Sequence, residues 1–310
     1  MKDETALRDR FRGCLLGLAC GDAVGTTLEF RRRGSFQPIT DMVGGGPFGL
    51  KAGEWTDDTS MALCLATSLV ERRGFDAADQ MNRYVNWWHH GYLSSTGSCF
   101  DIGVTVSAAL QRYLQTRDPM AGSTDPMSAG NGSLMRLAPA VLFGHPDMAA
   151  AMDLARRSSA TTHATAEAVE CCALFAELLC HALDGHPKDA ILSSRLAAPT
   201  MPKVQAIAAR DYLHKRESQI AGTGYCVASL EAALWCFAHT DSFEAAVLRA
   251  ANLGDDADTT AAIVGQLAGA HYGKAGIPAR WLVRLHQRDE IERLADALLA
   301  KSSAPSSRSP

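Results

Sequence analysis

The sequence predicts an all-α protein with one compact domain, and three observations point to this fold class. Apolar residues recur every three or four positions, as on one face of a helix, near both ends and in the second half of the chain. Runs in which apolar and polar residues alternate, the pattern of a half-buried strand, are nearly absent. No linker-like change of composition divides the middle of the chain, so we expect a single domain over residues 1–301 and a disordered Ser- and Pro-rich tail over residues 302–310.

Composition narrows the class of protein further. The 310 residues are 47% hydrophobic and 21% charged, which argues against a disordered, collagen-like or disulfide-stabilised chain. The formal charge of −4 argues against nucleic acid as a partner, because neutralising phosphates needs a basic face. Nine scattered cysteines without a CxxC pair suit a reducing compartment. The acidic N-terminus is unlike a signal peptide and no apolar run approaches the ~20 residues of a membrane span, so we expect a cytoplasmic protein without a membrane partner.

The first predicted helix has an apolar face made of Leu7, Phe11, Leu15 and Leu18. Four glycines on the same stretch lie four positions apart, namely Gly13, Gly17, Gly21 and Gly25. Such a ridge of small residues lets another helix approach closely. We expect Gly13 and Gly17 to pack in this way, whereas Gly21 and Gly25 can instead end the helix and begin a loop.

Helical spacing returns in two later stretches, one with Leu230, Ala233, Leu234 and Phe237 and one with Ile291, Leu294, Ala295 and Leu298. Clusters of Gly and Pro at residues 44–47 and 118–119 predict loops between the helices.

Two acidic segments lie where helices are expected to begin. Residues 55–60 (WTDDTS) and residues 254–260 (GDDADTT) both run into apolar stretches. One interpretation is ordinary capping, in which a Thr or Asp accepts a backbone N–H at the helix start. A cap needs one side chain, however, and each segment carries adjacent acids that repel one another without a cation. Asp and Thr oxygens are hard ligands, so the segments together indicate Mg²⁺, Mn²⁺ or Ca²⁺, with two cations ~3.5–4 Å apart if they face each other.

A competing interpretation comes from Asp256, Asp258 and Thr260, which match the DxDxT string of aspartyl-phosphate phosphatases. Those enzymes carry the string after a strand near the start of an α/β domain. Here it follows a helical pattern over residues 243–253, late in the chain. A metal-dependent phosphatase therefore stays an alternative hypothesis.

Seven short blocks carry a resemblance to a known family. In chain order they are GLACGDAVG at 17–25 followed by Glu29, TDDT at 56–59, CFDIG at 99–103, GNGSLMR at 130–136, TH at 162–163, GTGY at 222–225 and DADT at 256–259. Each block alone is weak, but seven in order across most of residues 8–275 form a specific pattern. The chain resembles the ADP-ribosylglycohydrolase family.

The resemblance implies an orthogonal bundle of many helices around two divalent cations, Mg²⁺ or Mn²⁺. By motif matching, the implied ligands are Thr56, Asp57, Asp58, Asp256, Asp258 and Thr259. The implied reaction is hydrolysis at the anomeric carbon of the distal ribose. The implied partners are an ADP-ribosylated protein as substrate and ADP-ribose as product.

Two further carboxylates, Asp101 and Glu29, are the candidate catalytic residues, because both lie outside the implied ligand set. A glycosidic transition state carries positive charge, so a neighbouring carboxylate can stabilise it or activate water. Glu29 can alternatively be a solvated loop acid beside residues 31–33, and Asp101 can be a cap for the helix through Val104. Which of the two acts as acid or base is left open.

Substrate contacts are expected mainly from two Gly-rich segments, made of Gly130, Asn131, Gly132 and Ser133 and of Gly222, Thr223 and Gly224. Their backbone N–H groups would be open to the diphosphate. Tyr225 would stack on the adenine or belong to the core, and His163 would contact substrate or cap a helix.

We expect the ADP-ribose to be attached to an arginine side chain of the substrate protein, since the CFDIG block resembles the arginine-directed branch of the family. Alternatives are a serine-linked or O-acetyl-ADP-ribose hydrolase and a non-catalytic ADP-ribose-binding protein. The family commonly has Gly-Gly before its second acidic pair, whereas Asp255 takes the second of these positions here. The departure leaves the implied ligand set intact and bears on its geometry.

Overall fold

The computed structural model describes residues 2–195 and 198–302, and within them the chain is helical with no β-sheet. The α-helices are α1 (Lys2–Gly25), α2 (Asp57–Arg72), α3 (Ala77–His90), α4 (Val104–Thr116), α5 (Ala138–Gly144), α6 (Met148–Ala160), α7 (Ala166–Leu183), α8 (Lys188–Ile191), α9 (Pro202–Ala208), α10 (Cys226–Ala238), α11 (Phe243–Ala251), α12 (Ala257–Tyr272), α13 (Ala279–Arg284) and α14 (Arg288–Ser302). Short 3-10 helices are η1 (Thr26–Leu28), η2 (Pro126–Ser128), η3 (Asp211–His214), η4 (Glu217–Gln219) and η5 (Lys274–Gly276). The all-α prediction is confirmed. Of the tail predicted to be disordered, residues 303–310 lie outside the described residues, and Ser302 is the last residue of α14.

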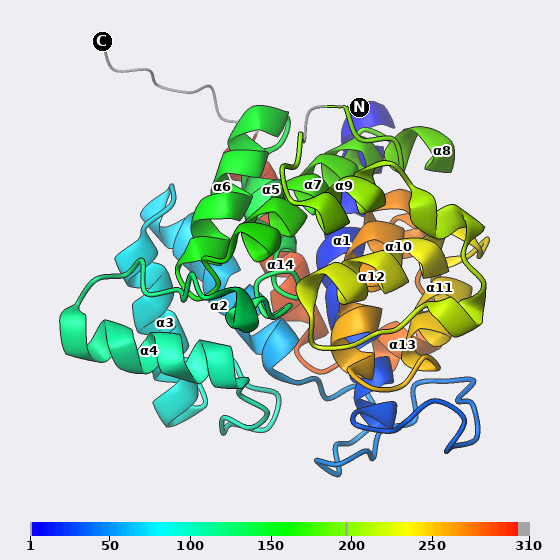
Figure 1. Ribbon diagram of the computed structural model, residues 1–310, viewed down its shortest axis with the longest axis horizontal. Helices are drawn as coiled ribbons and strands as arrows, with labels where there is room; N and C mark the ends of the chain where they lie inside the picture. The colour runs from blue at the N-terminus through cyan, green and yellow to red at the C-terminus, as the bar shows by residue number, and fades with distance from the viewer. Residues whose placement is uncertain (1, 196–197, 303–310) are drawn as a thin grey trace.

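The centre of the fold is the antiparallel pair α1 and α12, which lie side by side in Figure 1. Glycines on both helices make this close approach possible. A Cβ on Gly17 or on Gly265 would come within 3.0 Å of the other residue's carbonyl oxygen, closer than real Cβ atoms come. Gly13 meets Gly269 in the same way. The predicted glycine ridge is therefore the surface on which α12 packs.

Gly21 and Gly25 extend the same ridge, because α1 continues through Gly25. A Cβ on Gly21 would collide with the backbone of Ala261, and one on Gly25 with that of Ala257. The possibility that these glycines end the helix is therefore wrong for Gly21, while Gly25 is the last residue of α1. The packing places the end of α1 directly beside the start of α12.

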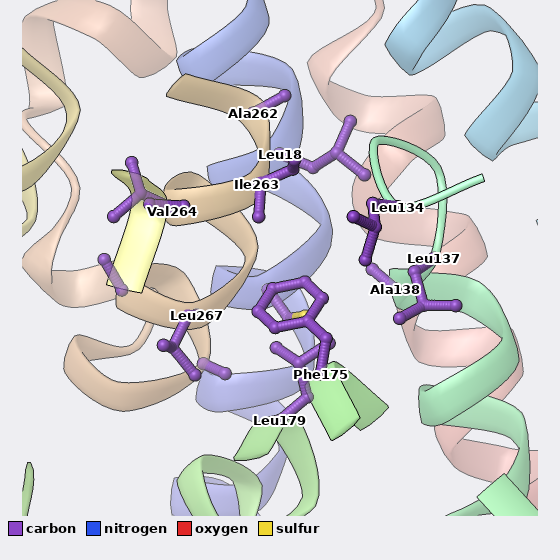
Figure 2. Packing of buried hydrophobic residues seen from close by; sticks show 14 of the residues in the cluster. Leu18, Leu134, Leu137, Ala138, Phe175, Leu179, Ala262, Ile263, Val264 and Leu267 are labelled. Atoms are coloured by element: carbon purple, nitrogen blue, oxygen red, sulfur yellow. The ribbon is translucent and has the colours of Figure 1, made fainter. Parts of the chain in front are cut away.

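Around this pair, other helices complete a large hydrophobic core. Figure 2 shows Leu18 of α1, Ile263 and Leu267 of α12 and Phe175 and Leu179 of α7 pointing toward one another. A second, smaller cluster joins α2, α3 and α4, and its largest buried side chains include Met61, Tyr84 and Trp87. All nine cysteines are free, and all but Cys99 are buried. Among the described residues, no helix has the length and apolar character to cross a bilayer.

Candidate functional site

A cavity of about 560 Å³ opens where the end of α1 meets the starts of α2, α4 and α12. Its wall includes carboxylates from all of these regions, namely Glu29, Asp57, Asp101, Asp255, Asp256 and Asp258. Backbone from both Gly-rich segments completes the wall. Segments far apart in the sequence thus converge on one cleft, as the two acidic helix starts predicted.

The start of α2 is capped from a distance by Asp22, a residue of α1 that is fully buried. One carboxylate oxygen of Asp22 accepts the backbone N–H and the hydroxyl of Thr56, both at 2.9 Å. The other accepts the N–H of Thr59 at 3.0 Å and its hydroxyl at 2.6 Å. Thr56 is the N-cap residue but makes no side-chain cap. The sequence prediction missed Asp22, although it lies within the GLACGDAVG block.

The start of α12 is capped in a corresponding way by Glu29, which follows η1. Glu29 Oε2 accepts the N–H of Ala257 at 2.8 Å, and the N-cap residue Asp256 makes no side-chain cap. Glu29 is buried, with 4% of its surface exposed, so it is not the solvated loop acid considered as an alternative. Oxygens of Glu29, Asp256 and Asp258 lie within 4.8 Å of one another. The carboxylate of Glu29 therefore lies beside two of the implied metal ligands, Asp256 and Asp258.

Asp22 and Glu29 cap the two helices, and Asp258 adds to the capping of α12 by accepting the N–H of Thr259 at 2.7 Å. Asp58 accepts the hydroxyl of Thr259 through Oδ1 at 3.2 Å, while its buried Oδ2 has no partner. Asp258 Oδ2 lies 3.3 Å from the Thr56 hydroxyl, whose proton has the nearer acceptor Asp22 at 2.9 Å. Capping thus leaves an oxygen of Asp58 unused, and these helix starts carry more carboxylates than capping requires.

The residues present fit a pair of divalent cations. Buried carboxylates face one another with hydroxyl, amide and backbone partners, and the largest influences on their pKa values are burial, these hydrogen bonds and other carboxylates. A buried charge without compensation is costly. The unpaired oxygen of Asp58 and the all-oxygen donor set match hard cations such as Mg²⁺ or Mn²⁺.

This crowding shifts the acids of the cleft toward their neutral forms. Burial, and after it the charges of Asp256 and Asp101, raise the pKa of Glu29 to about 8 against the opposing effect of hydrogen bonds. Burial also raises the pKa of Asp22 to about 6. The pKa values of Asp57, Asp58 and Asp258 are raised well above the ordinary range, first by burial and then by neighbouring carboxylates.

Asp101 lines the cavity from the loop before α4. Its backbone has a φ of 55°, in the left-handed region, and its carboxylate forms no hydrogen bond with the described residues. Burial and then Asp256 raise its pKa to about 7. The N-cap of α4 is Gly103, so the alternative interpretation of Asp101 as a cap is wrong.

The two Gly-rich segments are joined by backbone pairing. Asn131 N–H donates to the carbonyl of Gly224 at 3.0 Å, and Gly130 and Tyr225 form an isolated bridge. The side chain of Asn131 donates to Asp256 at 2.7 Å, which ties these segments to the start of α12. The predicted substrate segments and the acidic centre therefore form one structure.

The predicted substrate residues fall into three groups. Gly130, Asn131, Gly132, His163, Thr223 and Gly224 line the acidic cavity. Ser133 and Gly222 lie behind its wall. The hydroxyl of Ser133 pairs with Ser159 at 2.8 Å, and a Cβ on Gly222 would meet Thr260 Oγ1 at 2.5 Å. Tyr225 lines a neighbouring cavity of about 710 Å³, whose wall shares Thr105, Gly130 and Gly224 with the first.

Comparisons with known proteins agree on one family. The sequence profile of the ADP-ribosylglycohydrolase family matches residues 3–308. An ADP-ribosylarginine hydrolase of Pseudomonas putida is 46% identical, over 95% of this chain and 79% of the relative. An ADP-ribosyl-[dinitrogen reductase] glycohydrolase of Rhodospirillum rubrum is 33% identical, over 95% of this chain and 97% of the relative.

A solved structure described as an ADP-ribosylglycohydrolase-related protein complex superposes with a TM-score of 0.85 at 45% identity, and covers 97% of this chain and 100% of that one. Sequence and fold thus give the same answer along the whole chain. The protein is a hydrolase that belongs to the ADP-ribosylglycohydrolase family.

Proposed function

We propose that this protein is a metal-dependent hydrolase that removes ADP-ribose from arginine side chains of modified proteins. The buried aspartates at the starts of α2 and α12, among which Asp58 Oδ2 has no partner in the described residues, are the observation that carries the metal dependence. Arginine as the modified side chain is supported by the relatives at 46% and 42% identity, both ADP-ribosylarginine hydrolases. The nine free cysteines support work in a reducing compartment such as the cytoplasm.

The cations, Mg²⁺ or Mn²⁺, would be held by Thr56, Asp57, Asp58, Asp256, Asp258 and Thr259, with Glu29 as a further oxygen donor from the same cluster. When bound, they would orient ribose hydroxyls and lower the pKa of the attacking water. Asp22 and Asn131 hold the ligands in place, the first through Thr56 and Thr59 and the second through Asp256.

Asp101 is the better of the two candidates for proton transfer. Its carboxylate lines the cavity and forms no hydrogen bond with the described residues, whereas an oxygen of Glu29 is taken by the N–H of Ala257. The raised pKa of Asp101, about 7, suits a group that gives and takes a proton near neutral pH. Glu29 then shapes the acidic centre, and with cations bound beside it its ionised form would stabilise the positive ribose in the transition state.

The rest of ADP-ribose would extend from the acidic cavity toward the second one. The N–H group of Gly132, which lines the cavity, has no partner among the described residues and is available to the diphosphate. At the far end, Lys203 Nζ lies 4.9 Å over one face of the Tyr225 ring, so the adenine would stack on the other face.

The test is release of free ADP-ribose from an arginine-ADP-ribosylated protein. We expect release with Mg²⁺ or Mn²⁺ and none after chelation. An Asp57→Ala, Asp258→Ala double variant should lose turnover, whereas Asp153→Ala, an exposed aspartate on α6, should retain it. Serine-linked and O-acetyl-ADP-ribose substrates run in parallel decide the linkage, and turnover of these but not of the arginine adduct contradicts the proposal.

A further inference from the structure

Arg136 is a buried cation without a carboxylate partner among the described residues. Its side chain is fully buried, and its guanidinium donates to the carbonyl oxygens of Gly132 at 2.5 Å and Ser158 at 3.3 Å. It also donates to Thr162 Oγ1 at 2.7 Å and lies 4.9 Å over the ring of Tyr84. A buried charge held only by neutral groups is expensive to keep. Its hydrogen bond to Gly132, a residue of the cavity wall, points to a role at the cavity.

The contact with Arg136 fixes the direction of the hydrogen bonds of Thr162. A guanidinium can only donate, so Thr162 Oγ1 is an acceptor toward it. Thr162 is fully buried and its hydroxyl proton needs an acceptor. Apart from Arg136, the described residues offer this oxygen one partner, Nδ1 of His163 at 2.9 Å. The hydroxyl therefore donates to Nδ1.

Because Nδ1 accepts this hydrogen bond, it is unprotonated, and the proton of the neutral imidazole lies on Nε2. The ring is neutral because burial, and after it the charge of Arg136, lower the pKa of His163 to about 3. Arg136 and Thr162 thus select one tautomer of His163, in which Nε2 is a hydrogen-bond donor.

This donor faces the cavity between two glycines. His163 lines the cavity wall although only 2% of its surface is exposed. A Cβ on either Gly130 or Gly132 would lie 3.2 Å from its Nε2. Nε2 forms no hydrogen bond with any described residue. A buried donor therefore points into the cleft without an acceptor.

The neighbouring backbone presents donors of the same kind. Arg136 holds the carbonyl of Gly132, and in a trans peptide the N–H of Ser133 points the opposite way. The N–H group of Gly132, which lines the cavity beside His163, has no partner among the described residues, and neither has that of Ser133 behind it. This part of the wall therefore offers hydrogen-bond donors, with a positive charge buried behind them, which is the chemistry that recognises an anion.

We propose that Arg136 and Thr162 are positioning residues that hold His163 as its Nε2–H tautomer, so that this N–H donates to an anionic oxygen of the substrate's diphosphate. The identity of the ligand rests on the proposed function, whereas the tautomer does not. The donor stays neutral, so it does not add a second charge beside Arg136.

The experiment compares Thr162→Val, which removes the hydroxyl at nearly constant volume, with Thr162→Ser, which keeps it. The ¹⁵N shifts of the His163 ring nitrogens report the tautomer, and calorimetry with ADP-ribose in Mg²⁺ reports binding. We expect Nδ1 of His163 to be unprotonated in the wild type and in Thr162→Ser. Thr162→Val should bind ADP-ribose about tenfold more weakly, the effect of one ordinary hydrogen bond, while Thr162→Ser stays near the wild type.

The inference is overturned by an Nδ1–H tautomer in the wild type, or by a folded Thr162→Val that binds ADP-ribose as tightly as the wild type. If Thr162→Val fails to fold, the wild-type ¹⁵N shifts and the shift change of Nε2 on adding ADP-ribose decide the matter. Failure of the proposed function looks different. There, the Nε2–H tautomer and ADP-ribose binding persist while arginine-linked substrate is not hydrolysed.

Discussion

Replacing Gly17 by alanine tests how the two central helices are packed. At an exposed helical position this change would stabilise the protein by about 1 kcal/mol, because alanine favours the helix over glycine. Here the new Cβ would collide with the carbonyl oxygen of Gly265, well inside the 3.4 Å at which ordinary contact begins, so the backbones of α1 and α12 must separate by about 1 Å. Overpacking of a well-packed core costs about 1–3 kcal/mol. The packing therefore reverses the sign expected from helix propensity.

The assay is urea and thermal unfolding in Mg²⁺, where each kcal/mol corresponds to a melting-point change of roughly 2–4 °C. Gly74→Ala is the matched control, because a Cβ at Gly74 would meet nothing within 4 Å. We expect Gly17→Ala to melt several degrees lower and Gly74→Ala to melt close to the wild type. Hydrolysis should weaken as well in Gly17→Ala, since α1 carries Asp22 to the start of α2. An unchanged or raised melting point for Gly17→Ala would refute the close approach of the helices.

Three further predictions concern the acidic centre. Asp22→Asn replaces the oxygen that accepts both the N–H and the hydroxyl of Thr59 by an NH2 group, which can accept neither. The Mg²⁺-loaded protein should therefore lose about 2 kcal/mol of unfolding free energy, measured by denaturation. An unchanged unfolding free energy would contradict the capping role. Burial raises the pKa of Glu29 to about 8 and that of Asp101 to about 7, so the folded metal-free protein binds protons more tightly than the unfolded chain. Its melting point should therefore fall as the pH rises from about 5 to about 8.5, and the gain in melting point on adding Mg²⁺ should grow over the same interval. A metal-free melting point that rises over this interval would contradict these pKa shifts. Asp255 is exposed, so Asp255→Asn should bind Mg²⁺ with an affinity within about threefold of the wild type, measured by calorimetry. Asp58→Asn should bind Mg²⁺ at least about tenfold more weakly. Equal losses of affinity in the two variants would place Asp255 among the ligands.

Local pattern was enough to predict the helical fold and the convergence of the two acidic segments. Helical spacing predicted α10 and α14, and the four-residue spacing of the glycines predicted a close helix contact. The partner of that contact could not be predicted, because Gly265 and Gly269 lie about 250 residues away from α1, and only the folded chain brings them together. The single-domain boundary stays a prediction.

Sequence pattern failed where a side chain acts on a distant element. Capping rules look for the cap next to the helix, yet Asp22 caps α2 and Glu29 caps α12 from elsewhere in the chain. Ser133 shares a motif with Gly132 but turns its hydroxyl toward Ser159, because direction within a turn is set by packing. Arg136 gave no signal beyond its block, since a sequence does not show which charges are buried without a partner.

The most direct test of the account is ADP-ribose release from an arginine-ADP-ribosylated protein, measured with the metal-free protein as Mg²⁺ or Mn²⁺ is added back. The account predicts no release without metal, and recovery that saturates as two cations bind per chain and that is lost in Asp58→Asn. Release at an unchanged rate after complete chelation, or in Asp58→Asn, would contradict the central claim that the buried aspartates of α2 and α12 hold the cations required for hydrolysis.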